Sequence, residues 1–85
     1  MEKYIMVTYN ISKLDQKNKM QFIRKLQGYD SIRKGKIERK HGILEEVHGF
    51  KFGTNTIIVP FGNKDKIMEI FRQFKVNIKS LIVYL

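Results

Sequence analysis

Five positively charged side chains lie close together between residues 31 and 42, in the segment SIRKGKIERKHG. One acidic residue, Glu38, and two aliphatic residues, Ile32 and Ile37, accompany them, so the segment can bury little of itself in a core. Lys and Arg side chains bind phosphate groups, and each phosphate that they neutralise releases counterions from a polynucleotide. The sequence therefore predicts a nucleic-acid contact made by Arg33, Lys34, Lys36, Arg39 and Lys40.

The backbone conformation of this segment decides how those side chains could bind. A single strand would point the three lysines, with Glu38, to one face and the two arginines to the other. On a mobile hairpin both sets could wrap around a phosphate backbone, with little base specificity, because phosphate contacts carry no sequence information directly. The alternative is a solvated edge strand whose lysines prevent edge-to-edge aggregation.

Residues outside this segment extend the predicted contact. The helix expected at 12–27 is also basic, and we expect support from Lys17, Arg24 and Lys25. Exposed aromatic rings can stack on unpaired bases, and the candidates outside the expected helices are Tyr29, Phe50 and Phe52. The stretch GFKFG is similar, over five residues, to the aromatic-and-glycine strand of RNA-recognition motifs. The simpler alternative is that Phe50 and Phe52 pack together on one face of a sheet.

The net charge of +9 is large for 85 residues and is unevenly distributed. Residues 1–42 hold eleven basic and four acidic side chains, a net +7, whereas residues 43–85 hold six and four, a net +2. A self-repelling positive surface reduces stability, so a polyanionic partner is the first explanation. The alternative is a lysine-rich proteome, in which lysines cover many unrelated surfaces.

No residue pattern predicts catalysis. The chain has no cysteine nucleophile, no phosphate-binding glycine loop and no Ser–His–Asp pattern. His41 and His48 are seven residues apart, but Gly42 and Gly49 make one helix through both unfavourable. Glu45 and Glu46 are consecutive and so do not face each other. We expect no catalytic residue, no metal site and no cofactor.

The hydrophobic pattern predicts strand, helix, strand, strand, helix and strand in that order. The strands are expected at 3–11, 31–40 (or a long hairpin arm there), 54–61 and 76–85, and the helices at 12–27 and 63–74. With both helices on one face and right-handed crossovers, this order gives an α+β, ferredoxin-like βαββαβ two-layer sandwich with an antiparallel sheet. A chain of this length holds one core, so we expect a single domain, 1–85.

Smaller signals refine these elements. Ser12 is the expected N-cap of the first helix, with Asp15 at the capping-box position, and Gly28 ends that helix. The second helix presents the stripe Ile67, Ile70, Phe71 and Phe74, with Asn63 as its N-cap. A short element is expected at ILEEV, and HGFKFG should lead into the next strand.

The N-terminal residues lack the apolar run of a signal peptide, and no stretch approaches membrane-spanning length. The absence of cysteine fits a reducing compartment. We therefore expect a cytoplasmic protein without a membrane partner. An exposed sheet edge would also allow a homodimer.

The stretch YIMVTYNIS, followed by KNKMQFIRKLQGYDSIRKGKIE, resembles the opening of the small CRISPR-associated ferredoxin-fold proteins. These are dimeric subunits of the spacer-integration complex, and some are described as metal-dependent nucleases. The resemblance covers about residues 1–38, and the aspartate that ends the family's first strand falls on Asn10 here. An amide binds a hard divalent cation poorly. The resemblance therefore implies dimerisation and binding to a duplex backbone rather than cleavage.

Taken together, these patterns favour a nucleic-acid-binding protein that grips the phosphate backbone without catalysis. RNA is favoured over DNA by analogy with proteins of this fold that present an open sheet. Two alternatives remain: a divergent metal-dependent nuclease or integration subunit, and a small viral or plasmid-type module that binds an acidic protein.

Overall fold

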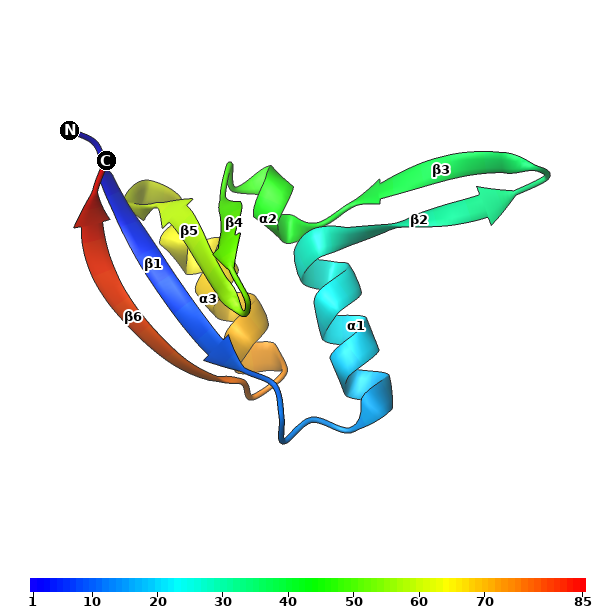
Figure 1. The fold of residues 1–85 in the computed structure, drawn as a ribbon, viewed down its shortest axis with the longest axis horizontal. Helices are drawn as coiled ribbons and strands as arrows, with labels where there is room; N and C mark the ends of the chain where they lie inside the picture. Colours follow the sequence, from blue (N-terminus) through cyan, green and yellow to red (C-terminus); the bar gives the residue numbers. More distant parts are fainter.

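The computed structural model describes residues 1–85 and contains a four-stranded antiparallel sheet, helices against it and a separate two-stranded hairpin (Figure 1). The predicted α+β class and the antiparallel sheet are confirmed. The elements in chain order are β1 (Lys3–Asn10), α1 (Gln16–Gln27), β2 (Gly28–Arg33), β3 (Lys36–His41), α2 (Ile43–Glu46), β4 (Phe50–Gly53), β5 (Thr56–Pro60), the 3₁₀ helix η1 (Phe61–Asn63), α3 (Lys64–Gln73) and β6 (Asn77–Tyr84).

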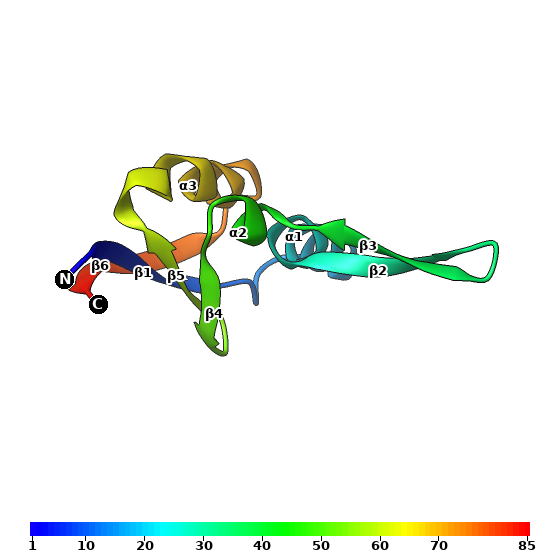
Figure 2. The ribbon, with the colours of Figure 1, turned by 90° about the horizontal axis from the view of Figure 1, so that it is seen from above.

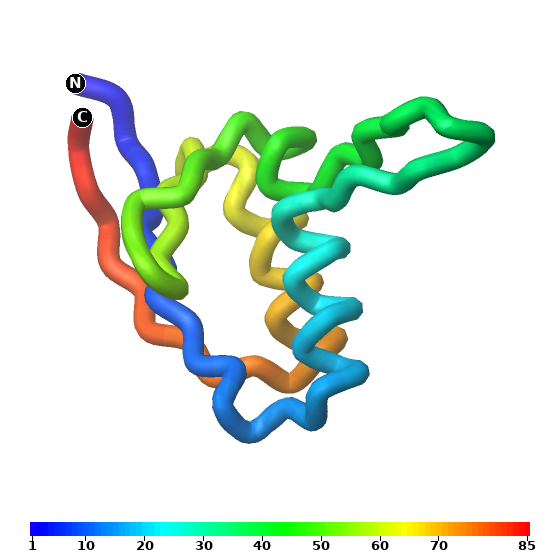
Figure 3. The backbone as a smooth tube through the Cα atoms, turned by 45° about the vertical axis from the view of Figure 1, so that its right-hand side comes forward, coloured from blue at the N-terminus to red at the C-terminus, as the bar shows by residue number.

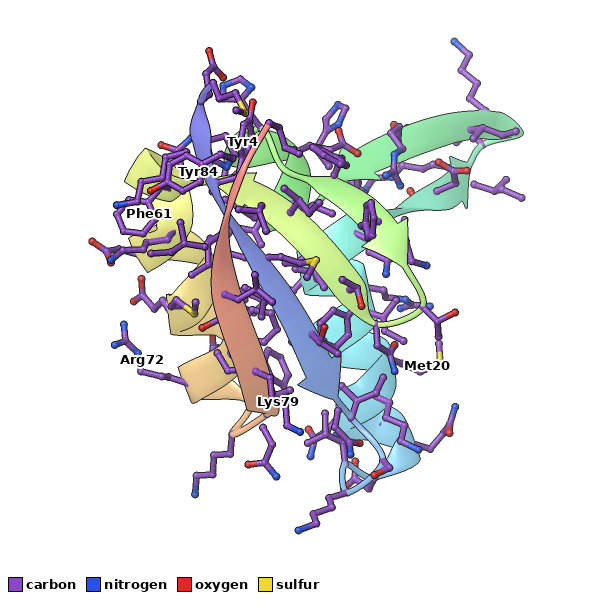
Figure 4. All side chains as sticks on the ribbon, turned by 60° about the vertical axis from the view of Figure 1, so that its left-hand side comes forward. Tyr4, Met20, Phe61, Arg72, Lys79 and Tyr84 are labelled. Carbon is purple, nitrogen blue, oxygen red and sulfur yellow. The ribbon has the colours of Figure 1, made fainter.

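The main sheet has the strand order β4-β5-β1-β6. Along β1, buried Ile5, Val7 and Tyr9 alternate with less buried residues, because successive side chains point to opposite faces of a sheet. The helices lie on one side of the sheet, and Figure 4 looks onto the other side, with the helices behind the strands. The sheet therefore has one covered face and one open face.

The core lies between the covered face and the helices. Four aromatic rings meet there, and the ring centroids of Tyr9 and Phe22 are 5.5 Å apart. Phe71 lies 5.6 Å from Tyr9, and Phe74 lies 5.5 Å from Phe22. Burial raises the pKa of the Tyr9 hydroxyl. The predicted helical stripe is confirmed, since α3 buries Ile67, Ile70 and Phe71 and packs Phe74 against the core.

The structure corrects the prediction that residues 31–40 form a strand of the main sheet. Residues 28–41 instead form the hairpin of β2 and β3, which pairs with no strand of the main sheet. In chain order, the second strand of the main sheet is β4, which is formed by residues that were expected only to lead into the strand at 54–61. Ile32 and Ile37 pair only with each other across the hairpin and stay exposed, whereas β4 is held in the main sheet by its pairing with β5, where Phe50 lies opposite Ile58.

The start of α1 also differs from the prediction. The Oδ1 atom of Asp15 accepts the backbone N–H of Asn18 at 2.8 Å, so Asp15 is the N-cap and the helix begins at Gln16. Ser12 instead donates its backbone N–H to Asn10 Oδ1 at 2.9 Å. Asn63 is the N-cap residue of α3, as predicted, but its side chain makes no capping hydrogen bond, and its Nδ2 donates to Val47 O at 2.9 Å.

The hairpin leaves the body of the protein where the chain crosses itself closely (Figure 3). Gly28 has φ of 80°, and a Cβ atom built on it would lie 2.2 Å from the carbonyl oxygen of Lys40. A Cβ on Gly42 would lie 2.4 Å from the carbonyl oxygen of Leu26. Only glycine allows this approach, which joins the hairpin to the end of α1. None of the helices combines the length and apolar character that a membrane-spanning segment needs.

Candidate nucleic-acid interface

Residues 28–41, called the arm from here on, project from the body along the longest dimension of the molecule, 45 Å (Figures 1 and 2). Each strand of the arm has six residues, which gives a length of about 20 Å. Lys34 and Gly35 join the strands with φ of 51° and 76°, as in a two-residue turn of type I′. The arm is therefore a regular two-stranded ribbon held away from the core.

Three of the predicted contact residues form a tip cluster, which consists of Arg33, Lys34 and Lys36. All three are exposed, and none of them is in a salt bridge. Arg33 and Lys36 lie directly opposite each other across the ribbon. Like charges in this position destabilise a strand pair. The tip cluster thus forms no ion pair within the protein, and the nearest acidic side chain is Glu38, which lines the same open hollow as the three cations.

The turn changes the predicted distribution of charge between the two faces of the arm. Lys36 and Lys40 share a face with Glu38, as the alternation predicts, but Arg33 lies on this face as well. The prediction for Arg33 was wrong because it assumed one continuous strand, whereas the chain reverses at Lys34 and Gly35. Lys40 Nζ lies 3.4 Å from Glu38 Oε2, so its charge is partly compensated.

Arg39 differs from the tip cluster, because it has internal partners at the base of the arm. Its Nη2 donates to Glu45 Oε1 at 2.8 Å and to Gln27 O at 2.7 Å, and its Nη1 lies 3.9 Å from Asp30 Oδ1. Sequence reasoning missed this arrangement, because Gly42 separates Arg39 from Glu45 and breaks any helix that could hold both. These contacts join β3 to α1 and α2.

Glu45 also forms a hydrogen bond with the Nδ1 atom of His41. The hydrogen bonds with His41 and Arg39 hold the pKa of the Glu45 carboxyl below its ordinary value. Asp30, Arg39, His41 and Glu45 are called the base cluster from here on. Sequence reasoning assigned no role to Glu45, and the structure gives it a position in this cluster.

The supporting residues predicted on α1 divide into two groups. Arg24 and Lys25 lie near the base of the arm, in an open hollow of about 450 Å³ that Tyr29 also lines. The Arg24 guanidinium lies 5.0 Å from the centre of the Tyr29 ring, and Lys25 Nζ donates to Gln73 Oε1 at 2.6 Å. Lys17 lies at the opposite end of α1, away from the arm (Figure 1).

The other two aromatic candidates lie apart from the arm, on β4. Phe50 is paired with Ile58 on the open face of the sheet and is 44% exposed. Phe52 is 65% exposed, and the register shift between Lys51 and Gly53 interrupts the alternation that would have placed both rings on one face.

The end of β1, where the family resemblance would require an aspartate, carries Asn10. Its Oδ1 accepts the backbone N–H of Ser12, and the hollow beside it is lined by Thr8, Tyr9, Asn10, Asn77, Ile78 and Lys79. No acidic side chain lines this hollow. Nowhere in residues 1–85 do three or more His, Asp or Glu side chains come close enough together to hold a metal ion. His48 follows α2, is exposed and has φ of 59°.

None of the protein-family models matches the chain, and neither a curated protein nor a solved structure is significantly similar to it.

Proposed function

We propose that the protein binds nucleic acid by gripping the phosphate backbone with the arm, without catalysis. The observation that supports this most strongly is the tip cluster: three cations at the end of a projecting ribbon, two of them opposite each other, none of them in a salt bridge. Phosphates bound by Arg33 and Lys36 would offset the repulsion between these two cations. Lys40, Arg24 and Lys25 would add longer-range attraction from the base of the arm.

The contacts at the base of the arm support the same proposal. The close crossing at Gly28 and Gly42, together with the base cluster, would restrict the directions in which the arm can leave the body. A fixed arm loses less conformational entropy on binding than a mobile one. Arg39 would therefore act mainly by positioning the arm, and the tip cluster would make the phosphate contacts.

We also propose that the body is a ferredoxin-like sandwich into which the arm and α2 are inserted. Without them, the order of elements is β1, α1, β4, β5, α3 and β6, which is the βαββαβ order. The strand order β4-β5-β1-β6, with antiparallel neighbours, supports this topology.

Single-stranded RNA is a second candidate partner, and the open face of the sheet favours it. Phe50 is half-exposed there, beside Met6 and Ile58, and a base could stack on its ring. A homodimer is a further proposal, because β6 has eight residues and no partner along its outer edge. Sedimentation at several protein concentrations tests the homodimer separately.

The test of the main proposal is fluorescence anisotropy with labelled single- and double-stranded DNA and RNA, at several salt concentrations. The test variant replaces the tip cluster (Arg33→Gln, Lys34→Asn and Lys36→Gln). The control removes the same charge from exposed lysines outside the arm (Lys13→Gln, Lys51→Gln and Lys66→Gln). We expect the tip variant to lose affinity and the control to lose much less. Equal losses would contradict a local site, and no binding to any polynucleotide would favour an acidic protein partner.

A further inference from the structure

The second face of the arm carries a small apolar surface that the proposed function has not used. Ile32 and Ile37 lie directly opposite each other across the ribbon, on the face that does not carry Arg33 and Lys36. They are 78% and 74% exposed, and neither packs against the core. We call them the Ile pair.

The Ile pair is more apolar than the arm itself requires. A cross-strand apolar pair contributes about 0.2–1 kcal/mol to a hairpin, and threonine, which is also β-branched, favours a strand without exposing so much apolar surface. Two side chains are also too small for a stable protein interface, which covers about 800 Å² on each partner. The Ile pair is small enough to contact isolated methyl groups on the floor of a narrow groove that carries negative charge along both sides.

We propose that the arm binds duplex DNA by lying in the major groove, with the Ile pair against the edges of the bases. The major groove of B-form DNA is about 12 Å wide and admits a two-stranded β-ribbon. The major groove of an RNA duplex is too deep and narrow for this. This inference rests on the proposed function, and it names the class of nucleic acid that the arm takes.

The two faces of the arm would then make different contacts. The face with the Ile pair, called the inner face, would lie against the groove floor. The opposite, outer face carries Arg33 and Lys36, whose long side chains would reach phosphates at the two rims of the groove. Asp30 is on the inner face, but Arg39 lies opposite it, with Nη1 3.9 Å from the Asp30 carboxylate. The one carboxylate on the inner face is therefore paired with an arginine that also donates to Glu45 on α2.

The chemistry of the groove floor predicts which bases the arm prefers. The apolar group that B-form DNA exposes in its major groove is the C5-methyl of thymine. Removing one buried methyl group weakens binding about fourfold, because the favourable free energy of transferring that group out of water is lost. The arm should therefore prefer thymine over uracil at the covered positions without a strict target sequence.

The experiment compares three duplexes of one sequence in the anisotropy assay: DNA with thymine, DNA with every thymine replaced by uracil, and RNA. For each thymine methyl group that the arm covers, we expect the native protein to bind the thymine duplex about fourfold more tightly than the uracil duplex. The variant Ile32→Thr/Ile37→Thr should discriminate less between the two DNA duplexes, because threonine keeps one methyl group but loses the rest of the apolar side chain, and its salt dependence should be unchanged. Ile32→Val/Ile37→Val should be intermediate. Leu81→Thr, which changes an exposed apolar residue on β6, should behave like the native protein.

The outcomes separate this inference from the proposed function. Equal affinity of the native protein for thymine and uracil duplexes, or a preference for the RNA duplex, would overturn the groove inference but leave backbone binding intact. No binding to any duplex or single strand would overturn both. Self-association that the Ile32→Thr/Ile37→Thr variant abolishes, measured by sedimentation, would assign the Ile pair to an interface between copies instead.

Discussion

The close crossing at the base of the arm gives the sharpest prediction about stability. Replacing Gly28 with alanine would put a methyl group 2.2 Å from Lys40 O and 2.8 Å from Gly42 N, both of which are backbone atoms. Gly28 also has φ of 80° and ψ of −178°, a region that is essentially restricted to glycine and costs other residues about 1–3 kcal/mol. Because the clash adds to this backbone cost, we expect Gly28→Ala to lower the free energy of unfolding by at least about 2 kcal/mol.

For a domain of this size, each kcal/mol shifts Tm by about 4–8 °C, so Tm should fall by about 10 °C or more. Thermal unfolding followed by circular dichroism measures this shift. The matched control is Gly62→Ala, because nothing lies within 4 Å of a Cβ atom there and φ is not positive. If Gly28→Ala melts within a degree or two of Gly62→Ala, the chain does not cross tightly at Gly28 and the arm is not held as described.

Three further predictions concern the cap of α1, the turn and the base cluster. Asp15→Ala should lower the free energy of unfolding, measured in urea, by about 1 kcal/mol, and Ser12→Ala should change it little. A larger loss for Ser12→Ala than for Asp15→Ala would show that Ser12 caps the helix. Lys34→Asn should leave the turn intact or strengthen it, because asparagine tolerates positive φ. The same change removes one cation, so the slope of the logarithm of the association constant against the logarithm of salt concentration should become less steep by about 0.9. Because the pKa of Glu45 is lowered in the folded protein, its contribution to stability is present above the ordinary carboxyl pKa and is lost as pH falls through the lowered value. The stability of Glu45→Gln should therefore be below that of the native protein at neutral pH and converge with it in acid, and a difference that does not depend on pH would contradict the role of this carboxylate.

Much of the body could be predicted from the sequence. The apolar spacing of Ile67, Ile70 and Phe71 fixes the buried face of α3, and the run at 56–60 is dense enough in β-branched residues to form an inner strand. β4 was harder to recognise, because all four of its residues are exposed and its strand character depends on pairing with β5.

The arm was only partly predictable. Its low apolar content shows that it cannot join the core, and a long hairpin arm was one of two conformations expected. The turn was missed because Lys34 occupies a position where asparagine, aspartate or glycine is the usual signal. Without the turn, the alternation assigns Arg33 to the wrong face of the ribbon.

The base cluster could not be found from sequence spacing at all. Arg39 reaches Glu45 and the end of α1 only because the chain crosses itself at Gly28 and Gly42, which is a tertiary contact. Sequence composition treats the five basic residues as equivalent. The structure separates them into the tip cluster, Lys40 beside Glu38, and Arg39 with its partners Glu45, Asp30 and Gln27 at the base of the arm.

The salt dependence of duplex binding tests the central claim most directly. The logarithm of the association constant for duplex DNA, plotted against the logarithm of salt concentration, changes by about 0.9 in slope for each phosphate that the protein neutralises. If the tip cluster makes three such contacts, the slope of the tip variant should be less steep than that of the native protein by about 2.7, and the slope of the Lys13/Lys51/Lys66 control should be unchanged. Parallel slopes for the native protein and the tip variant would show that the arm does not grip the phosphate backbone.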